Sequence, residues 1–150
     1  MIVLDTNVIS EPLRPRPSTT VIDWLDAQPA EALFVTAINV AELWAGVAML
    51  PEGARRSALE SSLDEMLAHL FADRRLPFDD RAARAYASIV GRTKAGGRGM
   101  PFADGLIAAI ALAHDFAVAT RDRAPFEMAG VQVIDPWSEP RRAGPSALES

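Results

Sequence analysis

Short apolar runs of strand length alternate along this chain with longer segments of helical periodicity. The runs are rich in residues that favour strands and fall at residues 2–4, 33–35, 75–78, 116–120 and 131–134. Helices are predicted at residues 7–11, 18–27, 38–50, 52–70, 79–94 and 101–114. This alternation predicts an α/β fold whose central sheet is mainly parallel and is covered by helices on both faces.

Length and composition are those of one globular domain. The chain has 150 residues, 49% of them apolar, and no cysteine, which excludes disulfides, thiolate metal sites and thiol catalysis. No segment predicts a membrane span or a signal peptide, so we expect a cytoplasmic protein. Pro, Arg, Gly and Ser dominate the C-terminal end, which predicts a domain over residues 1–137 and a flexible tail over residues 138–150.

The charge balance disfavours non-specific coating of nucleic acid, because the net charge is −5. It does not exclude an enzyme that brings nucleic acid to a metal cation. Fourteen of the fifteen basic residues are arginine, which suits phosphate contacts, although genome base composition explains the same bias more simply.

Four acidic residues differ from those that line polar helix faces. Glu42 is the only charge in residues 38–50, and Asp104 is the only charge in residues 100–113. So apolar a helix as 38–50 is predicted to be buried, and a buried carboxylate costs roughly several kcal/mol unless it is paired or bound to a metal. Asp5 and Asp122 each follow an apolar strand. Helix capping is an alternative role for Asp5 and Asp122. The alternative for Asp104 is that the helix dipole favours an acid in the first turn of a helix.

A metal site of oxygen ligands is the chemistry that these acids predict. Ligands bind at the carboxyl ends of parallel strands, and carboxylates without histidine or cysteine suit Mg²⁺ or Mn²⁺. His69 and His114 each end a predicted helix, where the helix dipole accounts for them. The GGRG sequence at residues 96–99 lacks the Lys-Ser/Thr ending of a P-loop and is predicted to be a hinge or lid.

Five motifs carry a family resemblance: LDTNVIS at residues 4–10, VAEL at 40–43, FADGLIAA at 102–109, ATRD at 119–122 and VIDPW at 133–137. In this order and spacing the sequence resembles the PIN-domain family, and within it the FitB-like branch of VapC-type toxins from type II toxin–antitoxin pairs. The resemblance implies a three-layer α/β sandwich and a Mg²⁺-dependent endoribonuclease. Its implied catalytic and metal-binding residues are Asp5, Glu42, Asp104 and Asp122, with Thr120, Thr6 and Asn7 as supporting residues.

The same resemblance implies partners. It predicts a homodimer and a small antitoxin that blocks the site, and it predicts that DNA is contacted only through the antitoxin. The amphipathic helix at residues 52–70 is best explained as core, although it could also hold an antitoxin segment or the second subunit.

The predicted reaction is hydrolysis of RNA phosphodiester bonds by a metal-activated water, which Glu42 or Asp122 would orient or deprotonate. Candidate phosphate contacts are Lys94, Arg98, Arg121 and Arg123. Two alternatives stay open. Haloacid-dehalogenase-type phosphatases also begin with a strand that ends in Asp, but they carry a second Asp where this chain has Asn7. The other alternative is a weakly active or inactive protein that acts mainly in an antitoxin–DNA repressor complex.

Overall fold

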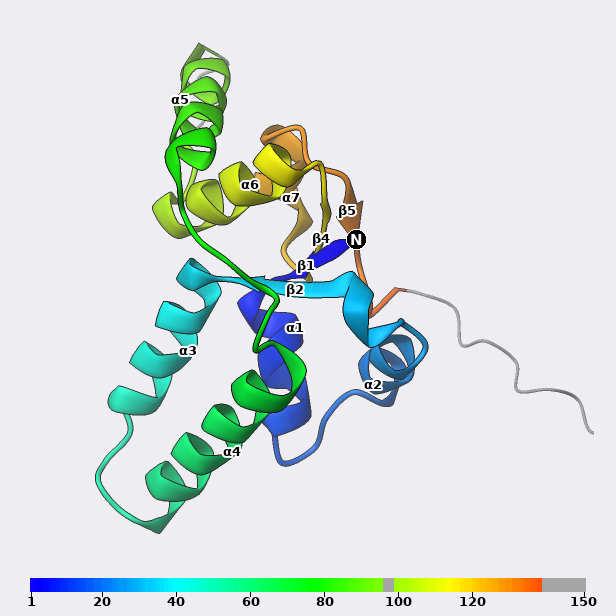
Figure 1. The fold of residues 1–150 in the computed structure, drawn as a ribbon, viewed down its shortest axis with the longest axis vertical. Helices are drawn as coiled ribbons and strands as arrows, with labels where there is room; N and C mark the ends of the chain where they lie inside the picture. Colours follow the sequence, from blue (N-terminus) through cyan, green and yellow to red (C-terminus); the bar gives the residue numbers. More distant parts are fainter. Residues whose placement is uncertain (96–98, 139–150) are drawn as a thin grey trace, which may run out of the picture.

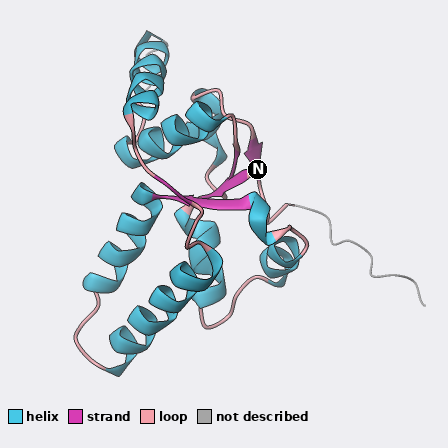
Figure 2. Cartoon of the chain, viewed as in Figure 1, coloured by secondary structure: helices cyan, strands magenta, loops and turns pink. Residues whose placement is uncertain are grey.

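The computed structural model describes residues 1–95 and 99–138. These residues form a five-stranded sheet in the order β3-β2-β1-β4-β5, and all its neighbouring strands are parallel. The strands are β1 (Ile2–Leu4), β2 (Leu33–Thr36), β3 (Arg75–Leu76), β4 (Ala117–Ala119) and β5 (Val133–Ile134). The sheet runs between two groups of helices (Figures 1 and 2), so the predicted parallel α/β sandwich is confirmed.

Each face of the sheet has its own helices and its own core. One face is covered by α1 (Thr6–Ser10), α2 (Thr19–Asp26), α3 (Ala37–Ala48) and α4 (Ala54–Leu70). The other is covered by α5 (Asp80–Ala95), α6 (Phe102–His114) and α7 (Arg123–Met128). Successive strand residues point to opposite faces. Leu4 accordingly belongs to the first core cluster and Val3 to the second.

Local signals set most of the element boundaries. Ser18 accepts a hydrogen bond from the Val21 amide and caps α2, and Asp79 accepts one from the Ala82 amide at the start of α5, as predicted. Two short 3₁₀ turns, Glu11–Leu13 and Ala30–Ala32, precede α2 and β2. The helix α7 was not predicted, because six residues are too few to show a helical period.

The strand order reverses at β1, and this reversal creates the crevice where the acids meet. From β1 the chain builds outward through β2 and β3 on one side, and β4 and β5 lie on the other. At such a switch point the connections after two neighbouring strands leave toward opposite faces and open a crevice between them. Here β1 leads into α1 and β4 leads into α7, on opposite faces of the sheet (Figure 1).

Two further sequence predictions concern membrane spans and the segments at residues 96–99 and 138–150. In the part of the chain that it describes, no helix has the length and apolarity needed to cross a membrane. Apart from Ser138, the predicted tail lies outside the described residues, as do residues 96–98 of the predicted hinge.

Candidate active site

Asp5 occupies the carboxyl end of β1 at the centre of the crevice, with only 6% of its surface exposed. Its Oδ1 accepts a hydrogen bond from the Thr6 amide over 2.8 Å, which caps α1, and its Oδ2 accepts one from the Thr120 hydroxyl over 2.8 Å. Capping is therefore one role of Asp5. The bond to Thr120 gives it a second connection, to the end of β4.

Thr120 joins Asp5 to the loop that carries Asp122. Its side chain is fully buried, and its Oγ1 accepts hydrogen bonds from the Asp122 amide at 3.0 Å and from Nδ2 of Asn7 at 3.5 Å. Asn7 in turn accepts from the Arg121 amide through Oδ1, at 3.4 Å. The predicted supporting residues Thr120 and Asn7 thus fix the two loops at the switch point relative to each other.

Asp104 and Asp122 approach from the face covered by α6 and α7. Asp104 lies half-buried in the first turn of α6. Asp122 is exposed and directly precedes α7, but its side chain makes no capping hydrogen bond, so the capping role considered for it is not observed. With Asp5 on the other side, carboxylates from three distant segments face one crevice.

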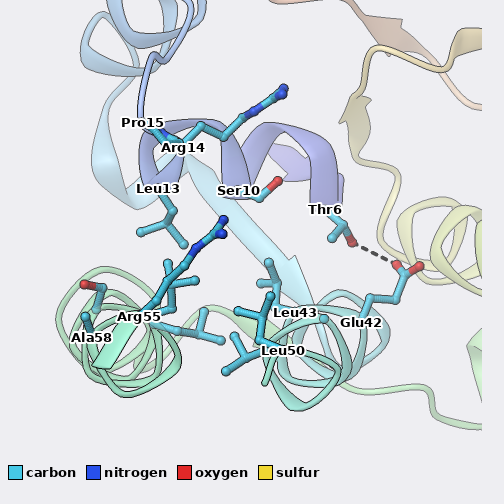
Figure 3. A pocket seen from close by; sticks show the side chains of 15 residues that line it. Thr6, Ser10, Leu13, Arg14, Pro15, Glu42, Leu43, Leu50, Arg55 and Ala58 are labelled. Atoms are coloured by element: carbon cyan, nitrogen blue, oxygen red, sulfur yellow. Dashed lines mark hydrogen bonds between the residues drawn. The ribbon is translucent and has the colours of Figure 1, made fainter. Parts of the chain in front are cut away.

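Glu42 corrects one expectation from the sequence. The helix α3 was predicted to be buried nearly all round, but only Asn39 and Leu43 on it are buried, and Glu42 is exposed. The helix contacts α1, α4 and α6, and Ala41, Glu42 and Ala45 on it stay exposed. Glu42 still belongs to the site, because its Oε1 accepts a hydrogen bond from the Thr6 hydroxyl over 2.8 Å (Figure 3).

Burial and the charges of neighbouring acids raise the pKa values of Asp5 and Asp104. Burial raises the pKa of Asp5, and the charges of Glu42 and Asp122 raise it further, against the lowering effect of the hydrogen bonds from Thr120 and Thr6. Burial raises the pKa of Asp104 to about 6, with added contributions from the charges of Asp5, Asp122 and Glu42. The fold therefore holds mutually repelling carboxylates near each other.

No cationic side chain relieves this repulsion in the part of the chain that is described. The ion pairs there are Arg14–Glu11, Arg56–Glu60 and Arg123–Glu127, and none involves the four acids. As they stand, no three Asp, Glu or His side chains among residues 1–95 and 99–138 are close enough to hold one metal ion.

His114 ends α6, about 15 Å of helix from Asp104, and its ring lies against Phe116.

Asn39 is a site residue that the sequence predictions missed. It is fully buried in the first turn of α3, and its Nδ2 donates to the Thr6 hydroxyl at 3.1 Å and to Oδ1 of Asp5 at 3.5 Å. The available signal was its place three residues after Thr36, since a polar pair with this spacing marks a capping box at a helix start.

The candidate phosphate contacts have different surroundings. The Arg121 guanidinium lies over the Trp137 ring, 5.2 Å from its centroid, beside the loop that carries Asp122. Arg123 pairs with Glu127 at 3.0 Å. Lys94 is exposed near the end of α5 that extends away from the sheet (Figure 1), and Arg98 lies outside the described residues.

A groove of about 650 Å³ opens beside Glu42, between α1, α3 and α4 (Figure 3). Thr6 and Glu42 line the end nearest the acids, whereas leucine, valine and alanine side chains line most of the remainder. Arg14 and Arg55 line it as well. Leu59 and Leu63 of α4 contribute to it, so the helix that was explained as core also forms the wall of a groove.

Comparison with known proteins identifies the family. The model of the PIN domain matches residues 2–131. The chain therefore belongs to the PIN-domain family, which confirms the resemblance found in its motifs.

Three named proteins are similar in sequence to this chain over most of its length. The chain is 51% identical over 137 residues to the plasmid stability protein StbB of Pseudomonas syringae pv. tomato, with 91% of this chain and 99% of that protein covered. It is 49% identical to the VapC ribonuclease Y4jK of Sinorhizobium fredii (91% and 98% covered) and 48% identical to the toxin FitB of Neisseria gonorrhoeae (93% and 100% covered).

Two solved structures contain chains that are similar to this one in both sequence and fold. The crystal structure of FitAcB from Neisseria gonorrhoeae contains a chain that is 47% identical and superposes with a TM-score of 0.89, with 93% of this chain and 100% of that chain covered. A FitAB complex bound to an IR36 DNA fragment gives a TM-score of 0.88 at 45% identity, with 95% and 100% covered.

Proposed function

We propose that this protein is the toxin of a type II toxin–antitoxin pair and an endoribonuclease that works in the cytoplasm on cellular RNA. The observation that carries the proposal is the crevice at the switch point. There, the charges of Glu42 and Asp122 add to the raised pKa values of Asp5 and Asp104, and no described ion pair supplies a cationic partner for these acids. A relative named as a VapC ribonuclease and one named as the toxin FitB support the same function.

The donor set fits a hard divalent cation, Mg²⁺ or Mn²⁺, because it consists of carboxylates whose mutual repulsion a cation would relieve. Asp5 and Asp104 are the best candidate ligands, since burial raises the pKa of each and the charges of the neighbouring acids raise it further. Asp122 and Glu42 are exposed, so an ion can reach both from solvent, and the Thr6 hydroxyl holds Glu42 through Oε1 alone. A bound ion would make water nucleophilic at neutral pH and stabilise charge on the phosphoryl group.

The chain's own residues have separable tasks in this proposal. Thr120 holds the Asp5 carboxylate in place through its hydroxyl. Glu42 or Asp122, at the open rim, would take the proton from the attacking water. Arg121 would bind a phosphate of the RNA backbone, because it lies beside Asp122 and its guanidinium is held on the Trp137 ring.

We further propose the groove between α1, α3 and α4 as the docking site of the antitoxin. Its apolar lining suits an apolar helical or extended segment, and Arg14 and Arg55 offer partners for acidic side chains of that segment. A segment in this groove would end beside Glu42 and so block the acids. The net charge of −5 is consistent with DNA contacts made by the antitoxin and not by this chain.

A homodimer is proposed through exposed apolar side chains, namely Met49 directly after α3 and Phe102 at the start of α6. Met49 is 85% exposed and Phe102 is 68% exposed, and Phe102 stacks edge-on against Tyr86 at 6.0 Å. Apolar surface of this kind marks a protein interface. Light scattering tests this directly: the wild type should have the mass of a dimer and Met49→Glu a lower one, whereas an unchanged mass would place the interface elsewhere.

The decisive experiment compares RNA cleavage by the wild type and by Asp5→Asn, each with Mg²⁺ and with a chelator. Only the wild type with Mg²⁺ should cleave, and restoring Mg²⁺ after chelation should restore activity. Equal cleavage by both proteins would refute the assignment. If the wild type is inactive but forms a DNA-bound complex with its antitoxin, the repressor function becomes the better account.

A further inference from the structure

Asn39 uses both ends of its side-chain amide. Its Oδ1 accepts hydrogen bonds from the Thr36 backbone amide at 3.0 Å and from the Thr36 hydroxyl at 2.7 Å. In return, the backbone amide of Asn39 donates to the Thr36 hydroxyl oxygen at 3.1 Å. The result is a reciprocal capping box at the start of α3. The oxygen must face Thr36, because a backbone N–H can only donate.

This orientation aims the side-chain amide hydrogens at Thr6 and Asp5. Nδ2 lies 3.1 Å from the Thr6 hydroxyl oxygen and 3.5 Å from Oδ1 of Asp5. Because Thr6 accepts from Asn39, its own hydroxyl proton is available for Oε1 of Glu42, 2.8 Å away. One buried amide and one hydroxyl therefore link Asp5 on β1 to Glu42 on α3.

The link through Asn39 and Thr6 carries no charge, so it does not compete with a cation for the carboxylates. A lysine or arginine in the same place would pair with the carboxylates and compete with a cation. The amide and the hydroxyl hold the two acids in position while leaving their negative charge uncompensated. Asn39 is fully buried, so the geometry is fixed by packing and by Thr36 and does not depend on a solvent-exposed rotamer.

We propose that Asn39 is a positioning residue of the metal site: through its direct bond to Asp5 and through Thr6 to Glu42, it fixes the carboxylate at the end of β1 and the carboxylate on α3 relative to each other for binding a divalent cation. The inference rests on the proposed function and adds to it a residue outside the four acids. A purely structural Asn39 would serve only the cap of α3.

The test separates these two roles. Mg²⁺ affinity is measured by calorimetry, without RNA, for the wild type, Asn39→Ala, Thr6→Val and the double variant. Asn39→Ala and Thr6→Val should each weaken binding about 10-fold, the lower end of what loss of a residue that orients metal ligands costs. The double variant should bind no more weakly than about the weaker single variant, because both substitutions break one link.

Ser18→Ala is the matched control. It removes the side-chain cap of α2, away from the acids, so it should lower the thermal midpoint without changing Mg²⁺ affinity. If Asn39→Ala behaves like Ser18→Ala, with lower stability and wild-type affinity, Asn39 is only a cap and the inference is wrong. Losses of affinity that multiply in the double variant would also overturn it, since the two residues would then act separately.

The outcome for the wild type distinguishes this inference from the function on which it rests. Wild-type protein that binds no Mg²⁺ would refute both. Wild-type protein that binds Mg²⁺, together with an Asn39→Ala variant of equal affinity, would refute only the role of Asn39. Should Asn39→Ala fail to fold, as judged by circular dichroism, Thr6→Val alone decides, because its side chain keeps the volume of threonine and removes only the hydroxyl.

Discussion

The Thr120 hydroxyl donates to Oδ2 of Asp5 over 2.8 Å, although 115 positions separate the two residues in the sequence. The bond joins the carboxyl ends of the two strands that meet where the sheet order reverses. It also lowers the pKa of Asp5, whereas burial raises that pKa. Thr120 therefore acts both on the position of Asp5 and on its ionisation.

Replacing Thr120 by valine should raise the pKa of Asp5 further, because the hydrogen bond to the carboxylate is lost while burial remains. We expect RNA cleavage on the acidic side of the profile to fall, because a smaller fraction of the Asp5 carboxyl is ionised at any given pH. The acidic limb of the pH–rate profile should move to higher pH. Thr120→Ser keeps the hydroxyl and should return the limb toward its original position. A limb that stays in place in Thr120→Val would contradict the role.

Asp104 should limit the stability of the metal-free protein. Its pKa is raised from 3.8 to about 6, so the folded state binds this proton more tightly than the unfolded state does. The folded protein then loses stability as pH rises through about 4 to 6, and the deficit persists at pH 7. Asp104→Asn should raise the thermal midpoint at pH 7.5 by about 2–4 °C, a small shift because solvent screens this half-exposed group.

Two conditions check the Asp104 prediction by calorimetric melting. At pH 4 the difference between the wild type and Asp104→Asn should disappear, because the carboxyl is then largely protonated in the folded protein. Adding Mg²⁺ at pH 7.5 should stabilise the wild type more than the variant, since an ion that binds the folded state raises its stability. A variant that is less stable than the wild type at pH 7.5 without Mg²⁺ would show that Asp104 is structural.

Arg121 and Arg123 form a matched pair for phosphate binding. Arg121 is stacked on Trp137 and has no carboxylate partner in the described ion pairs, whereas Arg123 is paired with Glu127. In a cleavage-deficient Asp5→Asn background, Arg121→Ala should weaken RNA binding by about 10-fold, a loss typical of one charge-assisted hydrogen bond. Arg123→Ala should change it by less than about 2-fold. Fluorescence anisotropy with labelled RNA measures both, and equal losses would remove the distinction.

Substitutions on α4 test whether the antitoxin binds in the groove between α1, α3 and α4. Leu59 lines the groove, and Leu59→Asp would place a charge on its apolar wall, which should weaken antitoxin binding at least about 10-fold. Leu70→Asp is the control, because Leu70 is on the same helix, is exposed and lies outside the groove. Surface plasmon resonance gives the affinities. Equal effects of the two substitutions would locate the antitoxin elsewhere.

The sequence predicted the fold well because its signals were local and repeated. Short apolar runs located the five strands and helical periodicity located most helices, and caps such as Ser18 and Asp79 marked where helices begin. The strand order needed more than this. A short strand such as β1 has no local signal that selects β2 and β4 as its neighbours, so the order of the strands in the sheet was not predicted.

The site was predicted unevenly for a similar reason. Isolated acids on apolar segments identified Asp5, Glu42, Asp104 and Asp122, yet burial was predicted wrongly for Glu42. The apolar composition of α3 was attributed to an internal core, but the structure leaves much of that surface exposed. Asn39 was missed because a single asparagine in a helix gives no sign of which strand end its amide will meet.

The central place of β1 in the sheet has a consequence for the cell that makes the protein. Asp5 leaves the ribosome 115 residues before Thr120, so its bond to Thr120 and the pairing of β1 with β4 cannot form until that later segment has been made. A chain still being synthesised therefore cannot carry a complete cluster of acids. A destructive nuclease assembled in this way stays harmless to the ribosome and message that are producing it until the β4 segment has emerged.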